Sequence, residues 1–353
     1  MQKLPENQTA FHVFVVNNFF SFLMHCRLIR LYNWSAKDCL FVTVRKFKLP
    51  EHFKEQGFES VDFSAAVEIS SRGWLVRHLF RPWKAWRIRK NIHDAIDAHS
   101  GGRDYDIFIY HSGSLTSDIL VCSRKCRGYW FVEEGLVAYT QHLAAEKPER
   151  SLPVYLSESY LLPFCAHKLS KWRFNRRSEL YRGTFASCPE AFPEFPERTV
   201  IGLPFSELET TPPDCRNVIV FDGGILSPDE EKANFELHLQ RISERKEPVA
   251  CYKFHPAWDE AKKALFREWF RDLERKYGIG IVELPSDLIL ENLAFTLKEK
   301  LSVHVLISSV GFYSALCGCH VYTSVKHFGR VLRRWNGIYG NLDPGVAGKL
   351  EYI

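Results

Sequence analysis

The sequence predicts an α/β protein with two domains, each built around a parallel sheet. Three observations lead to this prediction: the length of the chain, the alternation of short apolar segments with helical patterns, and a proline-rich break beyond its middle. With 353 residues the chain exceeds one comfortable hydrophobic core, and domains of about 100 to 200 residues make two the natural number. Alternation of strands and helices is typical of a parallel sheet.

Four apolar segments in the first half have the composition of buried strands. They lie at residues 13–16, 40–44, 107–110 and 129–132, with helical patterns between them. The apolar run at residues 11–24 is interrupted by His12, Asn17 and Asn18 and is shorter than the about 20 residues of a membrane span, so it fits a core strand better. We expect an N-terminal, acceptor-side domain over residues 1–205.

A linker is predicted at residues 206–216, because Pro212 and Pro213 follow Pro204 among polar residues. A second α/β series starts directly after it. Strands are expected at residues 218–221, 249–254, 279–282 and 303–307, and a charged helix at residues 260–277. Residues 217–353 are therefore predicted to form a C-terminal, nucleotide-binding domain.

Composition indicates a folded, soluble protein: 46% of the residues are hydrophobic and 25% are charged. Ten cysteines lack the paired spacing of a metal site. The N-terminus has no secretory-signal pattern, so we expect reduced, largely buried thiols and a cytoplasmic location.

Positive charge is concentrated at residues 72–90, a segment without an acidic residue in which tryptophan and leucine alternate with cations. The pattern predicts an amphipathic helix with aromatic residues at the boundary of its apolar face. Such a helix would lie on an anionic membrane surface or line a groove for a polyanionic acceptor; a solvated helix packed by its apolar face is the alternative. The patch includes Arg77, Arg81, Lys84 and Arg87. No recognised nucleic-acid module accompanies it.

Two glutamates follow the predicted strand at residues 129–132. Glu133 and Glu134 precede Gly135, which permits a tight turn. A partly desolvated carboxylate has a raised pKa and can act as a general base toward a hydroxyl. The alternative for this pair is a solvated turn or a helix cap.

In the second domain, His255 follows the strand predicted at residues 249–254, Lys253 adds a positive charge close by, and Pro256 keeps His255 extended. An imidazolium there would stabilise or protonate a leaving phosphate. The turn with Gly223 and Gly224 would let the backbone approach a nucleotide or an acceptor.

Ser308 and Ser309 follow the strand at residues 303–307 and precede a helical pattern, which is the arrangement of a phosphate cradle or of a helix N-cap. Glu291 stands among apolar residues at the start of another helix, where it would accept hydrogen bonds from a ribose diol or form an ordinary salt bridge.

These motifs, in this order, resemble those of bacterial sialyltransferases with two Rossmann-like domains, including the lipooligosaccharide and capsule polysialyltransferase branches. The matching residues are Glu133-Glu134-Gly135, His255-Pro256 and Ser308-Ser309. The resemblance implies a GT-B fold, with two Rossmann-like domains facing each other across a cleft. It also implies inverting transfer of sialic acid from CMP-sialic acid to a hydroxyl of a surface glycan, without a cofactor or required metal.

The resemblance further implies roles for the residues. Glu133 or Glu134 would deprotonate the acceptor, and His255 would assist departure of CMP. Ser308 and Ser309 would bind the phosphate and Glu291 the ribose. In some relatives a carboxylate of the second domain is the base, and Asp222 and Asp229 are the candidates for that role here.

The expected partners are thus a nucleotide sugar, a glycan acceptor that is free or lipid-linked, and the inner surface of a membrane. Two alternatives stay open. One is a transferase of similar fold that uses a CDP-activated polyol; the other is a non-catalytic protein that binds glycan or lipid through its basic segment.

Overall fold

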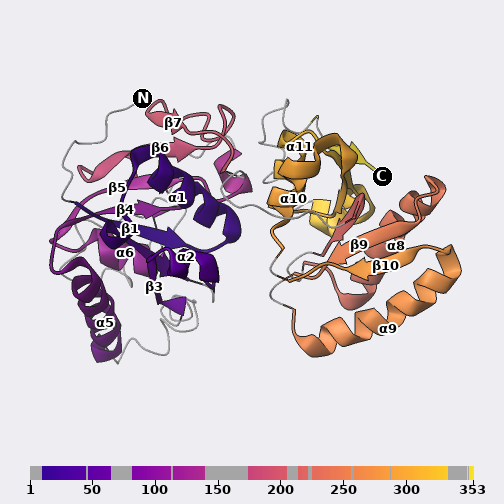
Figure 1. The fold of residues 1–353 in the computed structure, drawn as a ribbon, viewed down its shortest axis with the longest axis horizontal. Helices are drawn as coiled ribbons and strands as arrows, with labels where there is room; N and C mark the ends of the chain where they lie inside the picture. The colour runs from indigo at the N-terminus through magenta and orange to yellow at the C-terminus, as the bar shows by residue number, and fades with distance from the viewer. Residues whose placement is uncertain are drawn as a thin grey trace. The chain divides into compact units, whose positions relative to one another are not determined.

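The computed structural model describes residues 10–44, 47–64, 82–112, 114–139, 174–204, 214–221, 225–255, 258–286, 288–332, 348 and 350–353. Internal contacts divide the chain into two units, Met1–Pro204 and Phe205–Ile353. Figure 1 shows the first unit in indigo to magenta and the second in orange to yellow. Most of the linker expected at residues 206–216 lies outside the described residues.

The first unit contains a seven-stranded sheet in which every pair of neighbouring strands is parallel. Its order is β3-β2-β1-β4-β5-β6-β7, so the winding direction reverses between β1 and β4. The strands are β1 (Phe11–Val16), β2 (Cys39–Thr43), β3 (Glu59–Asp62), β4 (Tyr105–Ile109), β5 (Cys126–Val132), β6 (Tyr181–Ala186) and β7 (Arg198–Val200).

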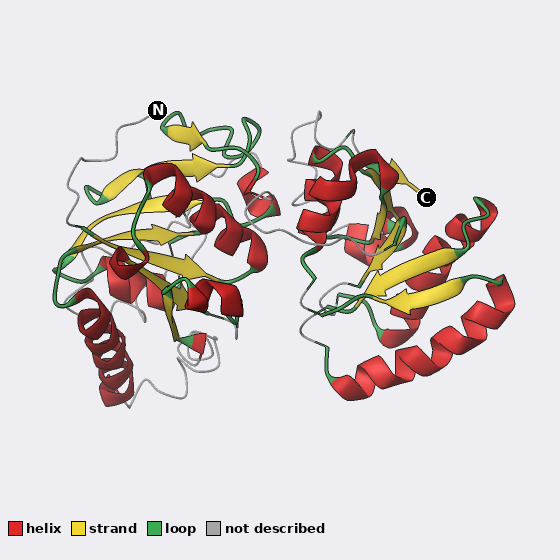
Figure 2. Cartoon of the chain, in the orientation of Figure 1, coloured by secondary structure: helices red, strands yellow, loops and turns green. Residues whose placement is uncertain are grey.

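Helices connect these strands and lie on both sides of the sheet (Figure 2). They are α1 (Phe19–Tyr32), α2 (Glu51–Glu55), α5 (Pro82–Ser100) and α6 (Leu115–Val121), with short 3-10 helices η1 (Ala36–Asp38) and η2 (Leu136–Tyr139). The start of α1 is fixed by a capping box between Asn18 and Ser21, and its end by Asn33 in the left-handed region (φ 52°).

The second unit contains a six-stranded parallel sheet with the order β10-β9-β8-β11-β12-β13. Counted from the first strand of the unit, this is the 3-2-1-4-5-6 order of a Rossmann fold, with its switch point between β8 and β11. The strands are β8 (Asn217–Val220), β9 (Val249–Lys253), β10 (Gly280–Glu283), β11 (Ser302–Val305), β12 (His320–Thr323) and β13 (Glu351–Tyr352).

The helices of the second unit have clear start and stop signals. Ser227 and Glu230 form a capping box on α8, Asp259 caps α9, and Gly278 ends α9 with φ 65°. The elements are α8 (Pro228–Glu244), α9 (Glu260–Tyr277), α10 (Leu290–Leu297) and α11 (Ser309–Leu316), with 3-10 helices η5 (Lys298–Lys300) and η6 (Val325–His327).

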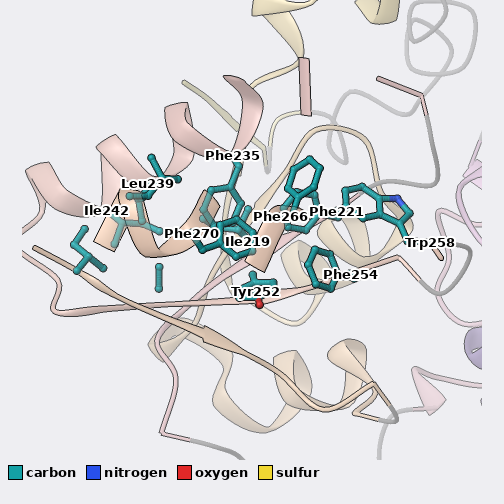
Figure 3. Packing of buried hydrophobic residues seen from close by; sticks show 13 residues of the cluster. Ile219, Phe221, Phe235, Leu239, Ile242, Tyr252, Phe254, Trp258, Phe266 and Phe270 are labelled. Carbon is teal, nitrogen blue, oxygen red and sulfur yellow. The ribbon is translucent and has the colours of Figure 1, made fainter. Parts of the chain in front are cut away.

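An aromatic core joins β8 and β9 to the helices α8 and α9 (Figure 3). Phe221 lies at its centre, with ring centroids 4.9 Å from Trp258 and 5.3 Å from both Phe235 and Phe254. Because Phe221 and Phe254 directly follow their strands, this packing fixes where the chain leaves the sheet at its carboxyl edge.

The prediction of two α/β domains with parallel sheets is confirmed. The expected strand at residues 249–254 ends at Lys253, and residues 11–24 form β1 and the start of α1. Within the described part of the chain, no helix has both the length and the apolar character needed to cross a bilayer. The nine described cysteines are free thiols, and seven of them are buried.

Candidate functional site

Polar residues of the first unit gather where β1, β5 and β6 end. Asn17 follows β1, Glu133 and Glu134 follow β5, and Ser187 follows β6. Because the strands are parallel, their carboxyl ends lie at one edge of the sheet, which is where open α/β sheets bind ligands.

Glu133 is completely buried and accepts hydrogen bonds from two residues that follow it in the chain. Its Oε1 accepts hydrogen bonds from Tyr139 Oη at 2.6 Å and from Ser187 Oγ at 3.0 Å, and its Oε2 accepts one from the Ser187 backbone N–H at 2.6 Å. Burial, together with the adjacent Glu133, raises the pKa of Tyr139 well above its usual range. Glu133 therefore ties β5, η2 and β6 together.

Glu134 has a different environment, because its side chain is only half-buried. Asn17 Nδ2 donates a hydrogen bond to Glu134 Oε1, and Asn18 Nδ2 donates one to the Glu134 backbone carbonyl at 3.1 Å. Asn17 itself is held by Ser21, whose Oγ donates to Asn17 Oδ1 at 3.2 Å. Asn17 thus orients the half-buried carboxylate, and Asn18 contacts the backbone of the same residue.

The sequence interpretation missed the role of Asn17 and Asn18 and treated them only as interruptions of an apolar run. The signal was present, since two short polar residues stand between a buried strand and a helix. A side chain at that position meets residues that follow the neighbouring parallel strands.

In the second unit, Lys253 is the last residue of β9 and His255 follows it as a half-buried residue. Burial lowers the pKa of His255, so its imidazole is neutral at neutral pH in the free protein. The remaining predicted residues of these turns, Asp222, Gly223, Gly224 and Pro256, lie outside the described residues.

Glu291 lies in the first turn of α10 and is only 8% exposed. Burial raises the pKa of its carboxyl group, and the Lys253 ammonium opposes that shift. Lys253 Nζ donates a hydrogen bond to the Leu288 backbone carbonyl, which connects the end of β9 to the segment before α10. The structure therefore brings Lys253 and Glu291 near each other.

Ser308 is the N-cap of α11, and its Oγ accepts a hydrogen bond from the Val310 N–H at 3.2 Å. The capping role anticipated as an alternative is therefore present. Ser309 begins the helix and is half-buried. Gly311 lets α11 approach β11 closely, because a Cβ atom at that position would lie 2.8 Å from a Val305 methyl group.

A buried carboxyl group that the sequence interpretation did not select is Glu231 of α8. Both of its carboxylate oxygens are buried, and they have no hydrogen-bond partner in the structure as far as it is described. Burial raises the pKa of Glu231 to about 7. By contrast, Asp229, an alternative candidate for the base, is exposed in the first turn of the same helix.

Only part of the basic segment falls within the described residues. Arg77 and Arg81 lie outside them, and Lys84 is placed within α5 without a described side chain. Arg87 is exposed on α5. Among the residues that the structure describes, no group of three or more His, Cys, Asp or Glu side chains could hold a metal ion.

No protein-family model and no curated protein sequence matches the chain. Solved structures do resemble it. A sialyltransferase from Photobacterium damsela superimposes with a TM-score of 0.50 at 10% identity, covering 98% of this chain and 81% of that one. A spinosyn rhamnosyltransferase complexed with thymidine diphosphate superimposes with a TM-score of 0.52 at 12% identity, covering 97% of this chain and 86% of that one.

A UDP-GlcNAc 2-epimerase from Methanocaldococcus jannaschii, in complex with UDP-GlcNAc and UDP, superimposes with a TM-score of 0.50 at 12% identity, covering 89% of this chain and 83% of that one. At such low identity these likenesses define the fold. Together with the two parallel sheets, they show the two-Rossmann-domain fold of GT-B glycosyltransferases, in agreement with the predicted fold class.

Proposed function

We propose that this protein is an inverting glycosyltransferase that transfers sialic acid from CMP-sialic acid to a hydroxyl group of a surface glycan, such as lipooligosaccharide or capsule. The observation that carries the proposal is the environment of Glu134. A half-buried carboxylate at the carboxyl edge of a Rossmann-like sheet, oriented by Asn17, is suited to act as a general base toward an acceptor hydroxyl.

The two glutamates of the motif have different roles in this proposal. Glu133 accepts three hydrogen bonds and is completely buried, so it supports the turn. Glu134 removes the proton of the acceptor hydroxyl. The acceptor oxygen then forms a bond to the anomeric carbon of sialic acid while the bond from that carbon to the phosphate oxygen breaks, and CMP leaves.

The second domain binds the nucleotide in this proposal. Glu291 accepts hydrogen bonds from the ribose hydroxyls, and the proximity of Lys253 favours its ionised form. Ser309 and the N–H groups at the start of α11 contact the phosphate, with Ser308 holding that helix end in place. Gly223, Gly224 and Pro256 complete the nucleotide contacts.

His255 assists the departure of CMP. Its pKa is lowered by burial in the free protein, and the negative charge of the donor phosphodiester beside it would raise that pKa again. The imidazole therefore takes up a proton when the donor binds and shares it with the leaving phosphate. No cofactor or metal enters this scheme.

The decisive experiment measures CMP release from CMP-sialic acid by the purified protein, with mixed glycan acceptors and without acceptor. Variants His255→Ala, Glu133→Ala and Glu134→Ala are assayed in parallel, each after its folding has been verified by thermal unfolding. The proposal expects acceptor-dependent release that requires Glu134 and His255.

CDP-glycerol serves as an alternative donor in the same assay, and conversion of UDP-GlcNAc is followed separately because it releases no CMP. Turnover of CDP-glycerol in place of CMP-sialic acid would indicate a polyol-phosphate transferase. Turnover of UDP-GlcNAc without an acceptor would indicate an epimerase. Absence of turnover and of CMP binding would support a non-catalytic protein.

A further inference from the structure

The two halves of helix α5 have different environments. Ile92, Ile96 and Ser100 are buried at a spacing of four residues, and they anchor the second half on the first unit. None of the described side chains of α5 before Ile92 is buried. The helix also extends away from the sheet of its own unit (Figure 1). Its first half is therefore a projecting segment.

Two tryptophans lie on this projecting half and are more than half exposed. Trp83 is 57% and Trp86 is 60% exposed, although an indole is among the largest apolar groups that proteins bury. Spacings of three, four and seven residues place Trp83, Trp86, Arg87 and Lys90 on one side of the helix. At 100° per residue, Trp83 lies about 180° around the helix from Ile92, whereas Trp86 lies about 120° from Ile92 and about 80° from Ile96. Trp83 therefore faces away from the domain, and Trp86 lies at the side of the helix with its indole exposed.

The sequence predicts an amphipathic helix with aromatic residues at the boundary of its apolar face. In the described part of α5, the anchoring stripe consists of isoleucines farther along the helix, and Trp83 and Trp86 lie outside that stripe. In its described part, α5 is therefore not packed on the domain by Trp83 and Trp86.

The charge of the projecting half has one sign. Between Pro82 and His93, α5 contains four cationic residues, Lys84, Arg87, Arg89 and Lys90, and no acidic residue. The first acidic residue is Asp94, which forms an ion pair with Lys90 at 2.6 Å. Exposed indoles and an excess of positive charge thus occupy the same part of the helix.

We propose that the first half of α5 docks the protein on an anionic lipid bilayer, with Trp83 and Trp86 inserted at the headgroup level and Arg87 and Lys90 facing the lipid phosphates. Indoles partition into the interface between headgroups and acyl chains, and cations add attraction to anionic lipids. A projecting helix can enter a headgroup layer, whereas a soluble polyanion is bound more effectively by a groove. The inference does not depend on the reaction that the protein catalyses.

The experiment uses the full chain and sedimentation with sucrose-loaded vesicles. Vesicles of phosphatidylcholine alone are compared with vesicles that contain phosphatidylglycerol as well. We expect the wild type to bind the mixed vesicles at least tenfold more strongly. Trp83→Ala/Trp86→Ala should lower the partition coefficient on the order of tenfold or more, and Arg87→Glu on the order of tenfold.

Matched controls come from α9, a helix that carries charges of both signs. Leu265→Ala removes another exposed apolar side chain, and Arg275→Glu reverses another exposed cation. Both should bind vesicles like the wild type. Trp83→Phe/Trp86→Phe keeps apolar rings on the same face and should retain most of the binding, which guards against a misfolded alanine variant.

Equal binding of the wild type to both kinds of vesicle, or unchanged binding of the folded double alanine variant, would overturn the proposal. The proposal would also be overturned if the double alanine variant lost binding to soluble polysialic acid or DNA but still bound vesicles. If the wild type did not bind vesicles but formed a dimer in sedimentation velocity, and the double alanine variant did not form that dimer, this face would be assigned to a second copy of the chain.

Discussion

The side-chain amide of Asn17 donates a hydrogen bond to the carboxylate of Glu134, 117 positions away in the sequence. This contact connects the end of β1 to the end of β5, with β4 between them in the sheet. It fixes Glu134 above the switch point of the first Rossmann-like unit, where a parallel sheet offers its binding site. The geometry distinguishes the two adjacent glutamates, because Glu133 faces Tyr139 and Ser187.

Replacing Asn17 should affect the proposed reaction more than the fold. Asn17→Ala frees the Glu134 carboxylate to rotate, and we expect kcat to fall by about 10- to 100-fold with an unchanged KM for the donor. Asn17→Asp places a like charge beside Glu134 and should move the acidic limb of the pH–rate profile to higher pH. Steady-state kinetics across pH measure both effects.

Asn18→Ala is the matched control, since Asn18 accepts the N-cap hydrogen bond from the Ser21 N–H at 2.8 Å. We expect it to lower the free energy of unfolding by about 1 kcal/mol through loss of the cap. A pH–rate profile that stays in place for Asn17→Asp would contradict the positioning role of Asn17.

Glutamine substitutions should separate Glu133 from Glu134. In Glu133→Gln, an amide replaces a carboxylate that accepts three hydrogen bonds, so we expect a loss of about 2 to 3 kcal/mol in the free energy of unfolding. Glu134→Gln should unfold like the wild type and lose at least a hundredfold in acceptor-dependent turnover. Urea unfolding and CMP release measure the two quantities. The opposite pattern would make Glu133 the base.

Glu291→Gln tests the proposed ribose contact. The amide replaces the carboxyl group near Lys253, and we expect about a tenfold increase in the dissociation constant for CMP. Glu299→Gln changes an exposed residue nearby in sequence and should leave CMP affinity unchanged. Titration calorimetry with CMP compares the two variants, and equal affinities would remove Glu291 from the nucleotide site.

The sequence was sufficient to predict the two α/β domains, because long apolar strands such as β1 and β5 alternate with well-capped helices. Short or polar edge strands such as β3 and β7 have weak patterns, since one edge of such a strand has no partner strand. The sequence also indicated that Glu133 and Glu134 follow a buried strand. Which of them is buried depends on Ser187 and Tyr139, contacts between distant segments that no local pattern encodes.

Buried histidines should make the protein sensitive to acid. His25 in α1 packs against Phe14 with ring centroids 5.1 Å apart, and its two nitrogens are buried without a hydrogen-bond partner in the described structure. Burial lowers the pKa of His25 to about 3. The unfolded chain, with a histidine pKa of about 6.5, therefore takes up the proton first as the pH falls, and stability decreases from about pH 6.5 downward.

His25→Leu removes this titration at nearly constant volume. Between pH 7.5 and pH 5.0 the wild type should lose about 2 kcal/mol more in the free energy of unfolding than the variant, because one proton is linked to unfolding below about pH 6.5. Met24→Leu, a buried and non-titrating neighbour in the same helix, should show the same pH dependence as the wild type. Urea unfolding at the two pH values measures these differences. If His25→Leu shows the same pH dependence as the wild type, then His25 is not protonated on unfolding. The acid sensitivity would then come from the other buried histidines, among them His238, whose pKa burial lowers to about 3.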